Sequence, residues 1–193
     1  MPQDQTHLFR IAFSYDLPVG RGKQFSTSSR AVDAIIGNWT VSSFLNYESG
    51  TPQTVTHNYS PIGTGSRVFI TSYEGWKTEA AEGDFDPYKH VWLDATKFNQ
   101  GIPQATLENV WGNATRNNPK LRSPWSLNES FGLARNFDFT ERFKFSIRGE
   151  AFNAFNRVRW GGPNNAITGA NFGQIRSQGN TPRRFQLALR LNF

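Results

Sequence analysis

A glycine-rich basic segment, Gly20-Arg21-Gly22-Lys23-Gln24, is the first stretch of the chain whose residue types suggest chemistry. In a nucleotide-binding phosphate loop, glycines let backbone amides approach the phosphates, and a lysine followed by serine or threonine completes the site. Here Leu17 stands where the first glycine is needed, and Gln24 stands where the hydroxyl is needed. The segment is therefore predicted to be a turn, and no nucleotide is expected.

The sequence contains few signs of a metal site or of a catalytic nucleophile. His7, His57 and His90 show no i, i+4 pairing, and the chain has no cysteine. Asp84, Asp86 and His90 could meet around a divalent cation, but acids exposed in a solvated loop are the commoner reason for such a cluster. No nucleophile-turn motif accompanies the serines. We expect no metal and no cofactor, and we do not expect an enzyme.

The basic residues are the remaining polar group of interest. The net charge is +6, and bases outnumber acids after Trp111. A basic region can bind nucleic acid, but these bases alternate with apolar residues instead of clustering, so no nucleic-acid partner is expected. In a barrel interior they would attract an anionic solute, hold acidic residues of a plug, or, most simply, keep the lumen wet. The bases expected to face the lumen are Arg10, Lys144, Arg148, Arg184 and Arg190.

The elements that position these bases are predicted to be β-strands. Aromatic residues make up 15% of the chain, which favours strands, and no apolar run approaches the ~18–20 residues of a membrane-spanning helix. From Phe185 to the end, apolar residues alternate with polar or small ones, and the strand is long enough to cross a bilayer at a tilt. The residues expected to contact lipid are Phe9, Ile11, Phe13, Phe143, Phe145, Ile147, Phe185, Leu187, Leu189 and Leu191.

Two charged residues share the apolar parity of the strand that contains Phe131 and Leu133. Arg135 lies near a predicted tight turn at Thr140, where a long cationic side chain can snorkel. Glu129 does not fit, because an acid facing lipid is unfavourable unless a bulge or register shift redirects it.

The predicted fold class is all-β, an antiparallel transmembrane β-barrel segment of about five strands with two long extracellular loops. Five strands cannot close, since the smallest single-chain barrels have about eight, and an open edge in lipid leaves unpaired backbone groups. We therefore expect a piece of a larger barrel, a truncated reading frame or part of an oligomer, and no signal peptide is recognised at the N-terminus. The predicted strands are approximately 7–17, 38–56, 124–138, 142–157 and 182–193, with a short helix at Arg30–Ile36 and long loops at 58–123 and 158–181.

A series of short motifs follows one order along nearly the whole chain. They are Leu17-Pro18-Val19-Gly20-Arg21-Gly22-Lys23, Gly37-Asn38-Trp39, Trp111-Gly112-Asn113, Glu150-Ala151-Phe152-Asn153-Ala154-Phe155-Asn156, Phe172-Gly173-Gln174-Ile175 and Pro182-Arg183-Arg184-Phe185. In order and spacing the series resembles the C-terminal barrel of the Oar-like, TonB-dependent transporters of Gram-negative bacteria.

The resemblance implies a plugged barrel of about 22 strands in the cell outer membrane, for uptake or export of a bulky solute. The partners it implies are outer-membrane lipid, the barrel-assembly machinery, the remaining strands and plug, and the TonB complex. It also implies that the assembly machinery reads a C-terminal signal, formed by Phe185, Leu187, Leu189, Leu191 and Phe193.

The main alternative is a soluble, secreted β-sandwich that binds a ligand such as a carbohydrate, since it would also show alternating strands separated by turns. Four tryptophans in the predicted loops could stack on a sugar or aromatic ligand: Trp76, Trp92, Trp111 and Trp160. Packing within ordered loops is the simpler interpretation, because isolated tryptophans usually find partners.

Overall fold

The computed structural model describes residues 4–26, 29–57, 66–70, 76, 85–98, 109, 111–138, 140 and 142–193. The chain forms two compact units. The sheet unit comprises Leu8–Tyr47, Leu127–Val158 and Thr181–Phe193. The loop unit comprises Met1–His7, Glu48–Ser126 and Arg159–Asn180.

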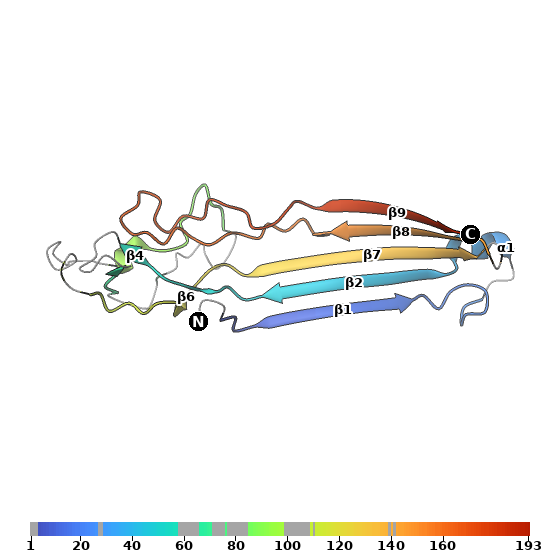
Figure 1. Cartoon of the computed structure of the whole chain (residues 1–193), viewed down its shortest axis with the longest axis horizontal. Helices are drawn as coiled ribbons and strands as arrows, with labels where there is room; N and C mark the ends of the chain where they lie inside the picture. Colours follow the sequence, from blue (N-terminus) through green and yellow to red (C-terminus); the bar gives the residue numbers. More distant parts are fainter. Residues whose placement is uncertain are drawn as a thin grey trace. The chain divides into compact units, whose positions relative to one another are not determined.

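The sheet unit is built on one antiparallel sheet of five long strands in the order β1-β2-β7-β8-β9 (Figure 1). Within the described part of the chain, β1 and β9 are the two edges, so the sheet is not closed into a barrel. The all-β antiparallel fold predicted from the sequence is confirmed. The strands are β1 (Leu8–Asp16), β2 (Trp39–Glu48), β7 (Ser126–Asp138), β8 (Lys144–Phe152) and β9 (Arg184–Asn192).

Several strands are shorter than predicted. The strand expected at 38–56 ends at Glu48, after which Gly50 packs against the backbone of Ser123 so closely that a Cβ there would overlap it. The strand expected at 142–157 ends at Phe152, because Asn153 adopts a left-handed φ of 50° and turns the chain. Apolar residues continue past both points, so a prediction from periodicity alone overestimated the lengths of these two strands.

The register of the sheet places the apolar residues on one face. Phe145 pairs with Leu191, and Ile147 pairs with Leu189. Between them Ser146 pairs with Arg190 on the opposite face. Because directly opposed residues of antiparallel strands share a face, the alternation within each strand becomes an apolar and a polar face.

The shorter connections lie within the sheet unit. Helix α1 (Arg30–Ile36) follows Ser29, which caps it, and lies at the end of the sheet where the chain ends (Figure 1). In the glycine-rich segment, the N–H of Lys23 donates to the carbonyl of Gly20 at 3.1 Å, as expected of a turn. Between β7 and β8, the Phe143 N–H donates to Oγ1 of Thr140 at 3.0 Å, while Phe139 and Glu141 lie outside the described residues.

The loop unit has a hydrophobic core of its own, so the described parts of the two predicted long loops are folded rather than plain connections. Its short elements are β3 (Pro52–Gln53), β4 (Thr56–His57), β5 (Ser66–Arg67), the 3-10 helix η2 (Ala95–Lys97) and β6 (Asn118–Arg122). Strand β3 pairs with β6, and β4 pairs with β5. The core residues are Val55, Val68, Ile70, Trp92, Leu93, Phe98, Ala114, Leu121, Phe172 and Ile175.

Gly173 is required by this core for two reasons. Its φ is +74°, and a Cβ at this position would overlap the carbonyl oxygen of Leu93. Its own carbonyl accepts from the N–H of Trp92 at 2.6 Å, which ties the segment containing Phe172 to the core. We expect Gly173→Ala to destabilise the loop unit by at least about 1–3 kcal/mol, the usual cost of a strained backbone.

Limited proteolysis of the loop unit measures this effect as faster cleavage in the variant. Gly162→Ala is the matched control, because a Cβ there meets only the flexible Gln53 side chain at 3.7 Å. Equal protease resistance of the two variants would contradict the assignment.

Candidate functional site

The polar face of the sheet carries the bases predicted to face a lumen. Arg148 on β8 pairs with Ala188 on β9, and its guanidinium lies 3.7 Å from the carboxylate of Glu150. Lys144 shares this face, since it has the same parity as Arg148 along β8. Arg190 and Arg184 on β9 share it too, because they pair with Ser146 and Phe152, which also have the parity of Arg148.

Arg10 joins the same face from the other side of the sheet. Its Nε donates to Oδ1 of Asn46 on β2 at 2.8 Å. The side chain of Ser42, on the same parity of β2 as Asn46, packs over Gly132 of β7. Gly132 in turn pairs with Glu150 on the polar face. The structure therefore brings all five predicted bases to one face that spans β1 to β9.

The opposite face is apolar and exposed in this chain. Phe185 and Leu187 retain 75% and 67% of their accessible surface, and Leu189 and Leu191 follow on the same side of β9. Exposed apolar patches of this kind mark membrane or partner surfaces. Phe143, predicted to face lipid, lies just before β8. Phe193, predicted to be part of the C-terminal signal, lies just after β9.

Glu129 is fully buried, with 0% of its surface exposed, although it has the parity of the apolar face. Nε of Arg157 lies 3.0 Å from its carboxylate. Arg157 reaches it because the chain turns after β8, where the Ala154 N–H donates to the Glu129 carbonyl at 2.8 Å. A bulge or register shift is therefore not needed to explain the acid at this position, because Arg157, which is distant in sequence, neutralises it.

Arg135 also lies on the apolar face, and it is buried instead of snorkelling to water as predicted. Its guanidinium donates to the carbonyls of Ile35 at 2.8 Å and Asp33 at 3.1 Å, in the last turn of α1. It also lies over the rings of Phe137 at 4.3 Å and Trp39 at 5.5 Å. The cation thus adds a second donor to each carbonyl, beside the Gly37 N–H on Asp33 and the Trp39 indole N–H on Ile35.

Asn153 holds the turn that follows β8, a role the sequence did not reveal. Its Nδ2 donates to the carbonyls of Arg157 at 3.0 Å and Thr181 at 3.2 Å, and its Oδ1 accepts from the Arg157 N–H at 2.9 Å. Asn156 in the same turn also has a positive φ. The Asn153-Ala154-Phe155-Asn156 motif was the only available signal, since asparagine tolerates the left-handed conformation.

A pocket of about 460 Å³ lies within the loop unit and is rich in aromatic side chains. His7 stacks on Trp125 with ring centroids 5.9 Å apart. Trp92 donates through Nε1 to the carbonyl of Arg122 at 2.9 Å, and Arg122 forms an ion pair with Asp4. The indole N–H of Trp92 and the guanidinium of Arg122, which both line the pocket, are therefore engaged within the protein.

Of the four tryptophans singled out from the sequence, Trp76 and Trp92 line this pocket, whereas Trp111 and Trp160 do not. Trp92 belongs to the core, and Trp76 and Trp160 pack against it. Trp160 meets the ring of Phe85 edge-on at 5.7 Å, whereas Trp111 is exposed. This arrangement supports packing within ordered loops over a stacking platform.

The candidate cation ligands form a local turn instead. The Asp86 carboxylate accepts from the N–H of Tyr88 at 2.9 Å and pairs with Lys89 at 3.3 Å. The hydrogen bond from Tyr88, and secondarily Lys89, lowers the pKa of Asp86 below its usual value. Nδ1 of His90 accepts from the Asp86 N–H at 3.2 Å, and Asp84 lies outside the described residues. No cluster of three or more potential metal ligands occurs among the residues that the structure describes.

An antiparallel sheet with one exposed apolar face and one basic polar face is the arrangement of strands in part of a transmembrane β-barrel. A family model for an outer membrane beta barrel domain matches residues 1–186, and the chain belongs to this family. No curated protein and no solved structure matches the chain. In the part of the chain that the structure covers, no helix is both long and apolar enough to traverse a bilayer.

Proposed function

We propose that this chain is the C-terminal barrel portion of a TonB-dependent, Oar-like transporter in the outer membrane, acting in the uptake or export of a bulky solute. The single observation that carries the proposal is the basic face shared by Arg10, Lys144, Arg148, Arg184 and Arg190, opposite the apolar face. In a barrel this arrangement puts the bases in the lumen, where charge tunes selectivity. The motif series that resembles the Oar-like family supports the finer assignment.

The remaining strands, the plug, the barrel-assembly machinery and the TonB complex are the partners of this proposal. The C-terminal residues Phe185, Leu187, Leu189, Leu191 and Phe193 are proposed as the signal that the assembly machinery reads. No catalytic residue, metal or cofactor is part of the proposal.

A comparison of solute depletion tests the transport role even though the solute is unidentified. Culture medium is profiled for cells with and without the complete protein, each in the presence and absence of TonB. We expect at least one bulky solute whose uptake or release requires both. If the protein resides in the outer membrane but no solute profile depends on TonB, that result would contradict a TonB-driven function.

Charge reversal on the polar face tests the role of the bases. We expect the double variant Arg148→Glu and Arg190→Glu to lower the uptake rate of an anionic solute about tenfold or more, since lumen charges set selectivity in barrels. The charge-conserving double variant Arg148→Lys and Arg190→Lys serves as the control for general effects of arginine substitution at these two positions. An unchanged rate in the double variant would leave the bases only the simpler role of keeping the interior wet.

The soluble β-sandwich alternative has no specific observation in its favour. A sandwich requires its apolar face to be covered by a second sheet, whereas the apolar side chains of β9 are exposed. Membership of the outer-membrane barrel family also opposes it.

A further inference from the structure

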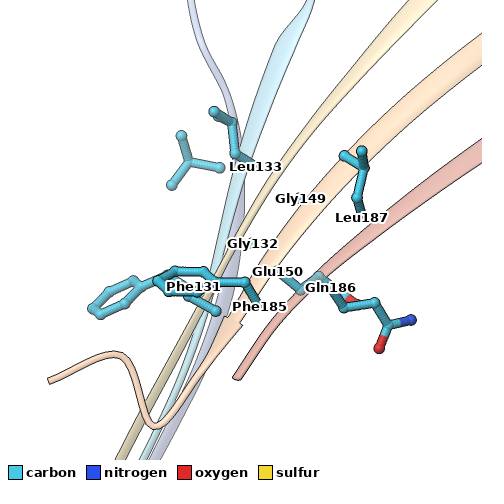
Figure 2. Close-up of a pocket in the computed structure, with 10 residues that line it drawn as sticks. Phe131, Gly132, Leu133, Gly149, Glu150, Phe185, Gln186 and Leu187 are labelled. Carbon is cyan, nitrogen blue, oxygen red and sulfur yellow. The ribbon is translucent and has the colours of Figure 1, made fainter. Parts of the chain in front are cut away.

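The apolar face of the sheet contains a groove of about 540 Å³ (Figure 2). Its floor is β8, at Gly149 and Ala151. Leu133 on β7 and Leu187 on β9 both pair with Gly149, so they stand on its two sides (Figure 2). The groove is therefore a channel along one strand, walled by its two neighbours.

Glycine makes this channel deep. A Cβ built on Gly149 meets no atom within 4 Å, so the space above it is open. Two residues along β8 on the same face, Phe131 and Phe185 lie on either side of Ala151. Neighbouring strands are about 4.8 Å apart, so the walls rise from backbones about 10 Å apart, and a hydrocarbon chain can lie between them.

Two arginines lie beside the aromatic walls at the end of the groove away from the C-terminus. The guanidinium of Arg183 lies over the ring of Phe185 at 5.6 Å. That of Arg157 lies over Phe155 at 5.7 Å, and Phe155 meets the wall residue Phe131 edge-on at 5.8 Å. Arg183 is exposed, and the Arg157 side chain retains 49% of its accessible surface beside its ion pair with Glu129.

We propose that this groove binds one anionic, phosphate-bearing membrane lipid, with an acyl chain along Gly149 and the headgroup phosphate between Arg157 and Arg183. The inference rests on the proposed membrane location of the apolar face. Guanidinium groups bind phosphate through paired, charge-assisted hydrogen bonds, and the apolar channel shields a hydrocarbon chain. The charge and the groove therefore match the two parts of one amphiphile.

A polypeptide strand is a poorer occupant of this groove. The backbone of β8 is already hydrogen-bonded to β7 on one side and β9 on the other. Peptides that bind along strands usually do so by adding to a free sheet edge. The groove lies over Gly149 and Ala151 of β8, between two paired neighbours, and so presents no free sheet edge.

Native mass spectrometry of the protein extracted from membranes in mild detergent tests the site. The probes are dioleoylphosphatidic acid and dioleoylglycerol, which share acyl chains and differ in the phosphate. We expect the phosphatidic acid to bind at least about tenfold more tightly, the scale of one charge-assisted contact. Arg183→Gln should remove about that factor, whereas the neighbouring Arg184→Gln, on the opposite face, should leave affinity unchanged.

Filling the channel tests the acyl-chain part independently. Gly149→Leu should weaken binding of both lipids, because its side chain occupies the open space above β8. Ala188→Leu adds the same bulk to the other face and should have no effect.

The two proposals fail in different ways. Equal binding of the two lipids, or binding indifferent to both Arg183→Gln and Gly149→Leu, would overturn the lipid site while leaving the membrane location intact. A protein recovered outside the membrane would overturn both.

Discussion

Leu187→Arg is expected to destabilise the membrane-inserted protein by about 2–4 kcal/mol, the cost of a cation at the bilayer midplane on the lipid face of a barrel. Leu187 lies near the middle of β9 and pairs with Gly149 on the apolar face. Its side chain retains 67% of its surface in this chain, so lipid is the environment that the substitution changes. Urea titration of the protein folded into phospholipid vesicles measures the difference.

Ala188→Arg is the matched control for this effect. Ala188 is the next residue of the same strand, and it pairs with Arg148 on the polar face. A second cation opposite Arg148 adds some repulsion, but in water-accessible surroundings the cost stays well below about 2 kcal/mol. Equal losses at the two positions would contradict the assignment of the faces.

Arg157→Met is expected to have the second large effect, because it leaves the buried Glu129 carboxylate without its cation. Breaking a buried ion pair costs about 3–5 kcal/mol, and we expect the lower end since Arg157 is itself half exposed. Removing the acid as well, in Glu129→Gln with Arg157→Met, should recover most of the loss. The same urea titrations, arranged as a double-mutant cycle, measure the coupling.

The cycle also has a clear negative outcome. Additive effects of the two substitutions would mean that Glu129 is neutralised by something other than Arg157. Arg148→Met serves as the control, because its ion-pair partner Glu150 lies on the polar face at the longer distance of 3.7 Å.

The sheet was predictable from the sequence because its information is local. Alternation at period two reports which side of a strand faces an apolar environment, and it identified the strands and both faces. The short helix at Arg30–Ile36 was also anticipated, and Ser29 caps it. Strand ends were less accurate, since they depend on single conformations such as the left-handed Asn153.

The loop unit and the two buried charges could not be predicted in the same way. The core of the loop unit joins residues from distant segments, such as Val55, Leu93 and Ile175, and their spacing follows no helical or strand period. Glu129 and Arg135 looked anomalous because their partners come from elsewhere in the chain, Arg157 and the carbonyls of α1. Predicting the groove would also have required the register of the strands, since only their pairing places Leu133, Gly149 and Leu187 side by side.

Cell fractionation tests most directly whether the sheet is embedded in a membrane. The chain is expressed with a signal peptide, and its partition between soluble, inclusion-body and outer-membrane fractions is measured. The exposed apolar face of β9 predicts recovery in the outer membrane, or only in detergent. A monodisperse, β-rich protein that stays soluble in plain buffer would contradict a membrane-embedded sheet and favour the secreted binding module.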